Sequence, residues 1–267
     1  MDFIKMQGTG NDYIFIDNTD KIIVSGQPEL AKRLSNRNYG IGGDGIVLIS
    51  KDDNGIFWMN MWNLDGSEGK MCGNAIRCVA KYLYENNMVN GLNFVIQTLS
   101  GPKDILIRAR NNEVYSVCVN MGKPYWETEK NLRIKIENQD FSLNCVSIGN
   151  PHCVIFTSEI FNKDKVEYYG KKIQEMDIFP NGVNVEFVKK INEDILNVQV
   201  FERGSGYTLS CGTGACASAA VFFKQYEGSN PLKVILAGGD LFIKQEKNQD
   251  IILEGDCVEV FKGKIKI

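Results

Sequence analysis

Two segments of the chain share one pattern: MCGNAIRCVAKYLY at residues 71–84 and SCGTGACASAAVFF at residues 210–223. After its first residue, each segment reads Cys-Gly, continues to a second cysteine, and then enters an apolar run. The apolar run predicts a buried helix, and Cys72 or Cys211 stands immediately before it. We therefore expect two similar helices, each with a cysteine at its start.

The two cysteines are 139 residues apart (211 − 72), and the same shift aligns other segments without a gap. The aligned pairs are GNDYIF at 10–15 with GNPHCV at 149–154, GGDGIVL at 42–48 with NGVNVEF at 181–187, and MWNLDGSEGKMCGN at 61–74 with VFERGSGYTLSCGT at 200–213. A tandem duplication of about half the chain explains one offset in separate segments.

The elements also recur in each half of the sequence. An apolar strand is followed by a helix pattern, PELAKRLS at 28–35 or GKKIQEM at 170–176, then by two strands and the Cys-Gly helix. Further strands close each half, and the final one is IILEGDCVEVF at 251–261. We expect an α/β protein of two pseudo-symmetric lobes, each a largely antiparallel sheet wrapped around a central helix. The predicted lobes are 1–120, with Cys72, and 121–267, with Cys211, and the last strand can return to the N-terminal lobe.

Composition argues against several classes of protein. The net charge is −3 without long runs of one sign, which disfavours nucleic acid or an anionic membrane as a partner. The N-terminus does not resemble a signal peptide and no apolar run could span a bilayer, so we expect a cytoplasmic protein. A single histidine and the cysteine spacings disfavour a metal site. Neither GTGND nor CGTGAC matches a phosphate-binding loop.

A cysteine at a helix start has a defined electrostatic environment. The first-turn N–H groups have no partner within the helix and favour an anion, either a thiolate or a bound carboxylate. Two such thiols at one cleft would suit inversion of an α-carbon, because one removes a proton and the other delivers one. The alternative is a duplicated core helix with a buried cysteine in each copy. Polar residues near the cysteines favour a site: Asn63, Asp65, Asn150, His152, Glu202 and Arg203.

The sequence resembles the diaminopimelate epimerases, which are amino-acid racemases that use no pyridoxal phosphate. The resemblance covers nearly the whole chain. Its motifs are GTGNDY at 8–13, NLDGSEGKMCGNAIRC at 63–78, GNPHC at 149–153, NVEFV at 184–188 and ERGSGYTLSCGTGAC at 202–216. It implies an isomerase that interconverts LL- and meso-2,6-diaminopimelate in lysine and peptidoglycan precursor biosynthesis, without cofactor or metal and as a homodimer.

The resemblance also implies roles for individual residues. Cys72 and Cys211 would be the thiolate and thiol of a two-base proton transfer, with His152 and Glu202 beside them. The carboxylate and amine at the reacting centre would be held by Gly73, Asn74, Gly212 and Thr213. The distal end of the substrate would be held by Asn11, Asn63, Asn150, Asn184, Glu202 and Arg203. A guanidinium suits a distal carboxylate, and Glu202 with the asparagines suits a distal ammonium.

Departures from the family pattern leave the substrate open. Tyr207 stands where the family has Glu, Ala75 where it usually has Gly, and Gly45 where some members have Gln. Tyr207 could reshape the pocket for another amino acid, or it could pack on the surface. The same chemistry on lanthionine, or on another amino acid such as histidine, therefore stays an alternative. A Cys–His hydrolase would leave one Cys-Gly segment unexplained, and an amino-acid-binding protein would need no thiols at the helix starts.

Overall fold

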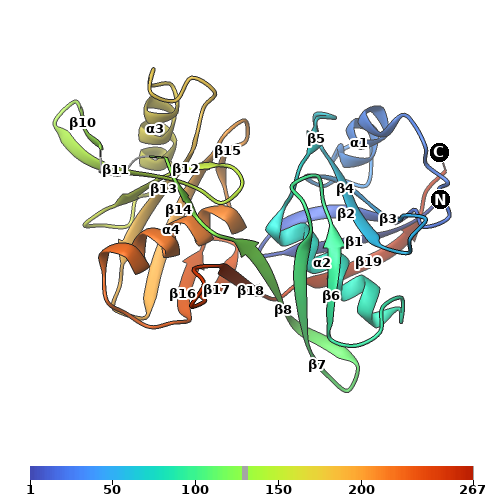
Figure 1. Cartoon of the computed structure of the whole chain (residues 1–267). Coiled ribbons are helices and arrows are strands. Elements are labelled where there is room, and N and C mark those ends of the chain that lie inside the picture. The colour runs from blue at the N-terminus through green and yellow to red at the C-terminus, as the bar shows by residue number, and fades with distance from the viewer. Residues whose placement is uncertain (128–131, 267) are drawn as a thin grey trace. The chain divides into compact units, whose positions relative to one another are not determined.

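The computed structural model describes residues 1–127 and 132–266, and the chain divides into two compact units (Figure 1). Unit 1 comprises Met1–Val119 and Gly255–Ile267, and unit 2 comprises Asn120–Glu254. The expected mixed α/β fold of two lobes is confirmed. Each unit is described on its own below.

Unit 1 contains two helices and a mostly antiparallel sheet. Its elements are β1 (Asp2–Gly8), β2 (Asn11–Asp17), α1 (Gln27–Ser35), β3 (Gly45–Lys51), β4 (Phe57–Asn63), β5 (Glu68–Gly69), α2 (Gly73–Glu85), β6 (Asn93–Gln97), β7 (Lys103–Arg110), the start of β8 (Glu113–Gly122) and β19 (Val258–Lys264). The pairs β2–β3 and β4–β6 are parallel, and the pairs β19–β1, β1–β2, β3–β4, β6–β7 and β7–β8 are antiparallel.

Unit 2 repeats this arrangement. Its elements after the end of β8 are β9 (Tyr125–Trp126), β10 (Leu132–Ile136), β11 (Gln139–Ser147), β12 (Pro151–Phe156), α3 (Lys163–Gln174), β13 (Asn184–Lys190), β14 (Ile195–Glu202), β15 (Gly206–Thr208), α4 (Gly212–Gln225), β16 (Leu232–Leu236), β17 (Gly239–Gln245) and β18 (Ile251–Gly255). The pairs β12–β13 and β14–β16 are parallel, and the pairs β11–β12, β13–β14, β16–β17 and β17–β18 are antiparallel.

The two units therefore share one order of elements and one pattern of parallel and antiparallel pairs. The shift seen in the sequence recurs in the structure, because α2 and α4 begin at Gly73 and Gly212, which are 139 residues apart (212 − 73). β3 and β13 begin at Gly45 and Asn184, with the same difference (184 − 45). The observed pairing thus matches the expected tandem repeat.

The helix that follows each Cys-Gly is the buried one. In unit 2, α4 contacts β11, β12, β13, β14, β16 and β17, so the sheet curls around it (Figure 1). The residues of α4 from Gly212 to Phe222 are almost all buried, and small side chains at Ala215, Ala217 and Ala219 allow close packing of the strands. In unit 1, α2 packs against β1, β2 and β7 and buries ten of its thirteen residues. A helix that is buried on most faces needs an apolar sequence on most faces, as both segments have.

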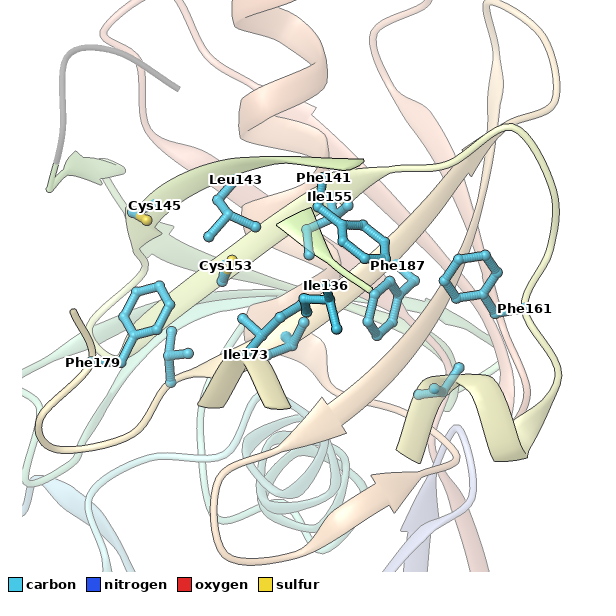
Figure 2. Packing of buried hydrophobic residues seen from close by; sticks show 13 residues of the cluster. Ile136, Phe141, Leu143, Cys145, Cys153, Ile155, Phe161, Ile173, Phe179 and Phe187 are labelled. Carbon is cyan, nitrogen blue, oxygen red and sulfur yellow. The ribbon is translucent and has the colours of Figure 1, made fainter. Parts of the chain in front are cut away.

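The other helix of each unit packs on the outside of the sheet. In unit 2, the side chains between α3 and the strands form one apolar cluster, which Figure 2 shows from close by. Phe141, Ile155 and Phe187 from three strands meet Ile173 from α3 there, and all four are buried. Cys145 and Cys153 lie in the same cluster as small apolar side chains, which agrees with the usual behaviour of free cysteine in cores.

Two elements differ from the sequence-based expectation. Helix α3 begins at Lys163, seven residues before the segment at 170–176 that carries the helix pattern, because Asn162 caps it through a bond from the N–H of Lys165. The segment 251–261 forms two strands rather than one. Of these, β18 pairs with β17, whereas β19 pairs with β1 in unit 1 (Figure 1).

Candidate active site: a cysteine-capped helix in each unit

Cys72 is the N-cap residue of α2. Its backbone is extended, with φ −137° and ψ 121°, and its Sγ accepts a hydrogen bond from the N–H of Ala75 at 3.5 Å. The thiol in turn donates to Oδ1 of Asn11 on β2, at 3.2 Å. The side chain is only partly buried. The structure therefore places this cysteine at the helix start, as the sequence predicts, and brings it together with one predicted substrate-binding residue.

The amide of Asn11 is held in one orientation by a carboxylate. Asp44 accepts from Asn11 Nδ2 at 2.6 Å, and Arg37 donates to the other oxygen of Asp44 at 3.2 Å. A carboxylate can only accept, so it binds the NH2 group of the amide and turns Oδ1 toward Cys72. Asp44 was not expected as a site residue, and its only signal in the sequence is the Gly-Asp-Gly turn before β3.

The first turn of α2 is anchored from inside the unit. Oδ1 of Asn74 lies 3.2 Å from the Thr9 hydroxyl, and the carbonyl of Gly73 accepts from Arg77 at 2.9 Å. Arg77 is fully buried, and its Nε donates to the carbonyl of Asp256 at 3.1 Å. Gly73 and Asn74 are thus fixed next to Cys72, where first-turn N–H groups favour an anion.

Asn63 lies at the end of β4, in the turn that leads to the Cys-Gly helix of unit 1. Its Nδ2 donates to the hydroxyl of Ser67 at 3.0 Å, and Ser67 also binds Asp65. The side chain is partly exposed. The structure therefore places Asn63 in the turn expected from the sequence.

Cys211 repeats the arrangement in unit 2. It is the N-cap of α4, with φ −126° and ψ 110°, and its Sγ accepts from the N–H of Gly214 at 3.4 Å. The Thr213 hydroxyl lies 3.4 Å from the same sulfur. In contrast to Cys72, this side chain is buried, with 5% of its surface exposed. Gly212 begins the helix between these two residues.

Burial decides the protonation of the Cys211 thiol. Loss of solvent raises the pKa of Cys211 well above its ordinary value, and the nearby charges of Glu202 and Glu186 raise it further. The helix end favours the thiolate by only about 0.3–1 kcal/mol, which is less than the roughly 1.4 kcal/mol of one pKa unit. Burial therefore opposes the predicted preference for an anion at this helix start and favours the thiol form of Cys211.

Glu202 stands beside Cys211, at the end of β14. Its Oε1 accepts from the Thr208 hydroxyl at 2.6 Å, and its carboxylate accepts a hydrogen bond from the Cys211 thiol. Burial raises the pKa of Glu202, and these two hydrogen bonds oppose part of the rise. The structure thus brings together the glutamate and the cysteine that the sequence analysis assigned to proton transfer.

His152 lies on β12 and is fully buried. Its Nε2 is 3.0 Å from Oδ1 of Asn150, in the turn between β11 and β12, and its Nδ1 is 2.7 Å from Oε1 of Glu186 on β13. Glu186 is also fully buried and was not expected in the site. The sequence did contain a signal for it, because Glu186 is the one carboxylate in the segment VNVEFV at 183–188 and stands between the apolar residues Val185 and Phe187.

Asn184 and Arg203 form a second cluster of predicted residues in unit 2. Asn184 donates to the carbonyl of Pro151 at 3.0 Å and accepts from the backbone N–H of Arg203 at 2.9 Å. The Arg203 guanidinium donates to the carbonyl of Asn181 at 3.0 Å and is otherwise exposed. Asn184 therefore fixes the backbone from which Arg203 extends.

Tyr207 lies on β15 and packs against the apolar cluster of unit 2 that Figure 2 shows. The ammonium of Lys163 is 5.8 Å from the centre of its ring, within the range of a cation–π interaction. These contacts support the interpretation of Tyr207 as a packing residue over its interpretation as a pocket residue.

In residues 1–127 and 132–266, no three His, Cys, Asp or Glu side chains are grouped so as to hold a metal ion. Within the same ranges, no helix is both long enough and apolar enough to cross a membrane.

Comparisons with known proteins agree on one family. The model of the family described as diaminopimelate epimerase matches residues 3–127 and 144–261. The diaminopimelate epimerase of Acetivibrio thermocellus is 38% identical over all of this chain and 99% of its own length. That of Halothermothrix orenii is 39% identical over all of this chain and 98% of its own length.

Solved structures show the same fold at low identity. A PhzF-family phenazine biosynthesis protein from Bacillus anthracis has a TM-score of 0.76 at 14% identity, covering all of this chain and 99% of its own. A hydroxyproline epimerase from Agrobacterium vitis has a TM-score of 0.71 at 15% identity, covering 99% of this chain and 90% of its own. The family model and the full-length relatives together show that the chain belongs to the diaminopimelate epimerase family.

Proposed function

We propose that this chain is an epimerase that interconverts LL- and meso-2,6-diaminopimelate by a two-base proton transfer at the α-carbon, without a cofactor. The proposal rests on one observation, which is the same in both units. Each unit has a free cysteine as the N-cap of its buried helix, at corresponding positions of the repeat. One thiolate takes the α-proton, and the other thiol delivers a proton to the opposite face of the carbon. Each turnover exchanges the two roles, so no other reactant is consumed.

The neighbouring residues support assigned roles in this reaction. We propose that Glu202, which accepts from the Cys211 thiol, and the buried His152 set the protonation of the two cysteines. The first turns of α2 and α4, with Gly73, Asn74, Gly212 and Thr213, would bind the α-carboxylate and stabilise the charge that develops on it.

The distal end of the substrate is assigned to the remaining polar residues. The exposed guanidinium of Arg203 suits a distal carboxylate, and Glu202 suits a distal ammonium. The amides that complete this set are Asn11, Asn63, Asn150 and Asn184. An amino-acid group at each end of the substrate is what this combination of charges would select, which favours diaminopimelate over histidine.

The test is proton NMR in D2O with reduced protein and LL-diaminopimelate, lanthionine or histidine in parallel. We expect loss of the α-proton signal with diaminopimelate. Exchange with lanthionine alone would assign the thioether analogue instead, and no exchange with any of the three would reject the proposed substrates.

The matched controls are Cys72→Ser and Cys211→Ser. A serine hydroxyl can accept the same N-cap hydrogen bond, so the helices should be retained. A hydroxyl does not ionise near neutral pH, so we expect formation of the meso isomer from LL-diaminopimelate to fall at least about 100-fold in each variant. Meso product that still forms in either serine variant at the wild-type rate would contradict a two-thiol reaction.

We further propose, from the family resemblance, that the protein acts in the cytoplasm and as a homodimer. Sedimentation equilibrium across a range of protein concentrations would measure the oligomeric state directly.

A further inference from the structure

Glu186 is a carboxylate in the interior of unit 2 with an unusual environment. The side chains of Glu186 and His152 are both fully buried, and Oε1 lies 2.7 Å from Nδ1 of the imidazole. A buried carboxylate is destabilising by several kcal/mol unless hydrogen bonds and charges compensate for its lost hydration. The stability of the fold alone therefore does not explain why a carboxylate is buried at this position.

The other carboxylate oxygen of Glu186, Oε2, lies in an equally unusual environment. Among the described residues, 1–127 and 132–266, no hydrogen-bond donor reaches Oε2, although this atom is buried. Oε1 lies 2.6 Å from the position that a Cβ of Gly214 would occupy, so the carboxylate packs against the first turn of α4. That end of a helix favours a negative charge. Among the hydrogen bonds of the described residues, the carboxylate thus has one side-chain partner, the imidazole of His152.

This contact determines which nitrogen of His152 carries a fixed proton. A carboxylate anion only accepts hydrogen bonds, so beside Glu186 in that form Nδ1 must be the donor. Nε2 faces Oδ1 of Asn150 at 3.0 Å, and the amide of Asn150 can turn to present either a donor or an acceptor. The environment of Nε2 therefore tolerates both protonation states, whereas that of Nδ1 tolerates one.

We propose that Glu186 is a positioning residue that holds His152 with Nδ1 protonated, so that Nε2 is the nitrogen that gains and releases a proton. Asn150 then lies beside the exchanging atom. A carboxylate that fixes the tautomer of a catalytic histidine is worth up to about 10⁴-fold in rate in other enzymes. The catalytic part of this inference rests on the function proposed above, whereas the state of the imidazole does not.

The chain offers a direct measurement, because His152 is its single histidine. Protein labelled with ¹⁵N-histidine gives one imidazole, and the ¹⁵N shifts of Nδ1 and Nε2 report which nitrogen is protonated. We expect Nδ1 to stay protonated at every pH at which the protein is folded. A neutral ring with its proton on Nε2 would overturn the proposal without the need for any variant.

The variant Glu186→Gln tests whether Glu186 is what fixes the tautomer of His152. A glutamine can donate to Nδ1 as well as accept from it, so we expect the Nε2-protonated form to appear in this variant. We also expect α-proton exchange to fall about 10²- to 10⁴-fold in kcat, with little change in KM. An unchanged tautomer would overturn the proposal, even with lost activity, because the loss would then be structural.

The matched control is Glu193→Gln, which removes an exposed carboxylate from the same unit and should change neither the spectrum nor the rate. Failure of the proposed function can be told apart from failure of this inference. In the first case the wild-type protein shows no α-proton exchange, and the ¹⁵N spectrum still reports which nitrogen of His152 is protonated. If Glu186→Gln does not fold, the wild-type spectrum alone supports or overturns the proposal.

Discussion

The buried carboxyl group of Glu202 has a cost for the stability of unit 2. Burial raises the pKa of its carboxyl in the folded state, so the folded protein holds this proton more tightly than the unfolded chain does. The free energy of unfolding is then largest, and the fold most stable, below about pH 4, near the ordinary pKa of Glu. It decreases as the pH rises through the folded pKa. At neutral pH, Glu202 therefore destabilises the unit in which it lies.

Glu202→Gln should remove this penalty, because Gln keeps an oxygen for the Thr208 hydroxyl but carries no charge. We expect the free energy of unfolding to rise at pH 8, with a smaller gain at pH 5, because the penalty is present only where the carboxyl group is ionised. Urea unfolding followed by circular dichroism at both pH values measures the difference. A loss of stability at pH 8 would contradict this account of Glu202.

At the residue level, the sequence identifies candidate site residues that belong to a repeated motif. It misses those whose role depends on contacts with other elements of the fold. Cys72 and Cys211 stand at the helix starts where the repeated Cys-Gly pattern places them. Glu186 and Asp44 have no repeated pattern, because their environment is created by residues from other elements. The raised pKa of Cys211 depends on burial by surrounding strands, which no local spacing records.

At the element level, α3 approaches β14 closely at Gly170. A Cβ at this position would lie 2.5 Å from both Cβ and Cγ of Phe201, which is shorter than any ordinary contact. Alanine is preferred over glycine inside a helix by about 1 kcal/mol. An overpacked interface typically costs about 1–3 kcal/mol. The cost of overpacking exceeds the gain in helix propensity, so the close contact with Phe201 requires glycine at position 170.

Gly170→Ala should therefore destabilise the protein by about 1 kcal/mol. In a Phe201→Gly background, which removes both the Cβ and the Cγ atom of this side chain, the clash is absent, and the same change should become stabilising through helix propensity. A double-mutant cycle by urea unfolding measures this sign reversal. Equal effects of Gly170→Ala in the two backgrounds would show that the contact does not limit the approach of the helix.

The sequence predicts the existence of elements better than their ends. The apolar and alternating runs mark most strands correctly, and the helix at 28–35 is observed as α1 (Gln27–Ser35). The start of α3 is missed because its first half, KDKVEYY, buries only Val166 and lacks a clear apolar stripe. The division of 251–261 into β18 and β19 is missed because both halves have strand propensity, and only long-range pairing with β1 separates them.

For the whole molecule, the repeat and the α/β class follow from the constant offset of 139 residues, whereas the composition of unit 1 from two separate segments does not. β19 pairs with β1, and the carbonyl of Asp256 accepts a hydrogen bond from the buried Arg77. Unit 2, in contrast, is formed by one continuous segment, Asn120–Glu254.

Removal of residues 256–267 should therefore affect the units unequally. Unit 1 would lose a paired strand and one of the two carbonyl groups that accept hydrogen bonds from the buried Arg77 guanidinium, and a buried donor left without its acceptor is destabilising. We expect amide hydrogen exchange, measured by mass spectrometry, to show lost protection in 1–119 and retained protection in 120–254. Loss of protection in both segments to the same degree would show that the units unfold together.

The pairing of β19 with β1 also has a consequence for synthesis on the ribosome. The chain emerges from its N-terminus, so β1 is available early, but Val258 follows Gly8 by 250 residues (258 − 8). At about 5–20 residues per second, one edge of β1 waits roughly 12 to 50 s for its partner. The continuous second half can be completed within that interval. The half of the molecule that is translated first is therefore the half that finishes folding last.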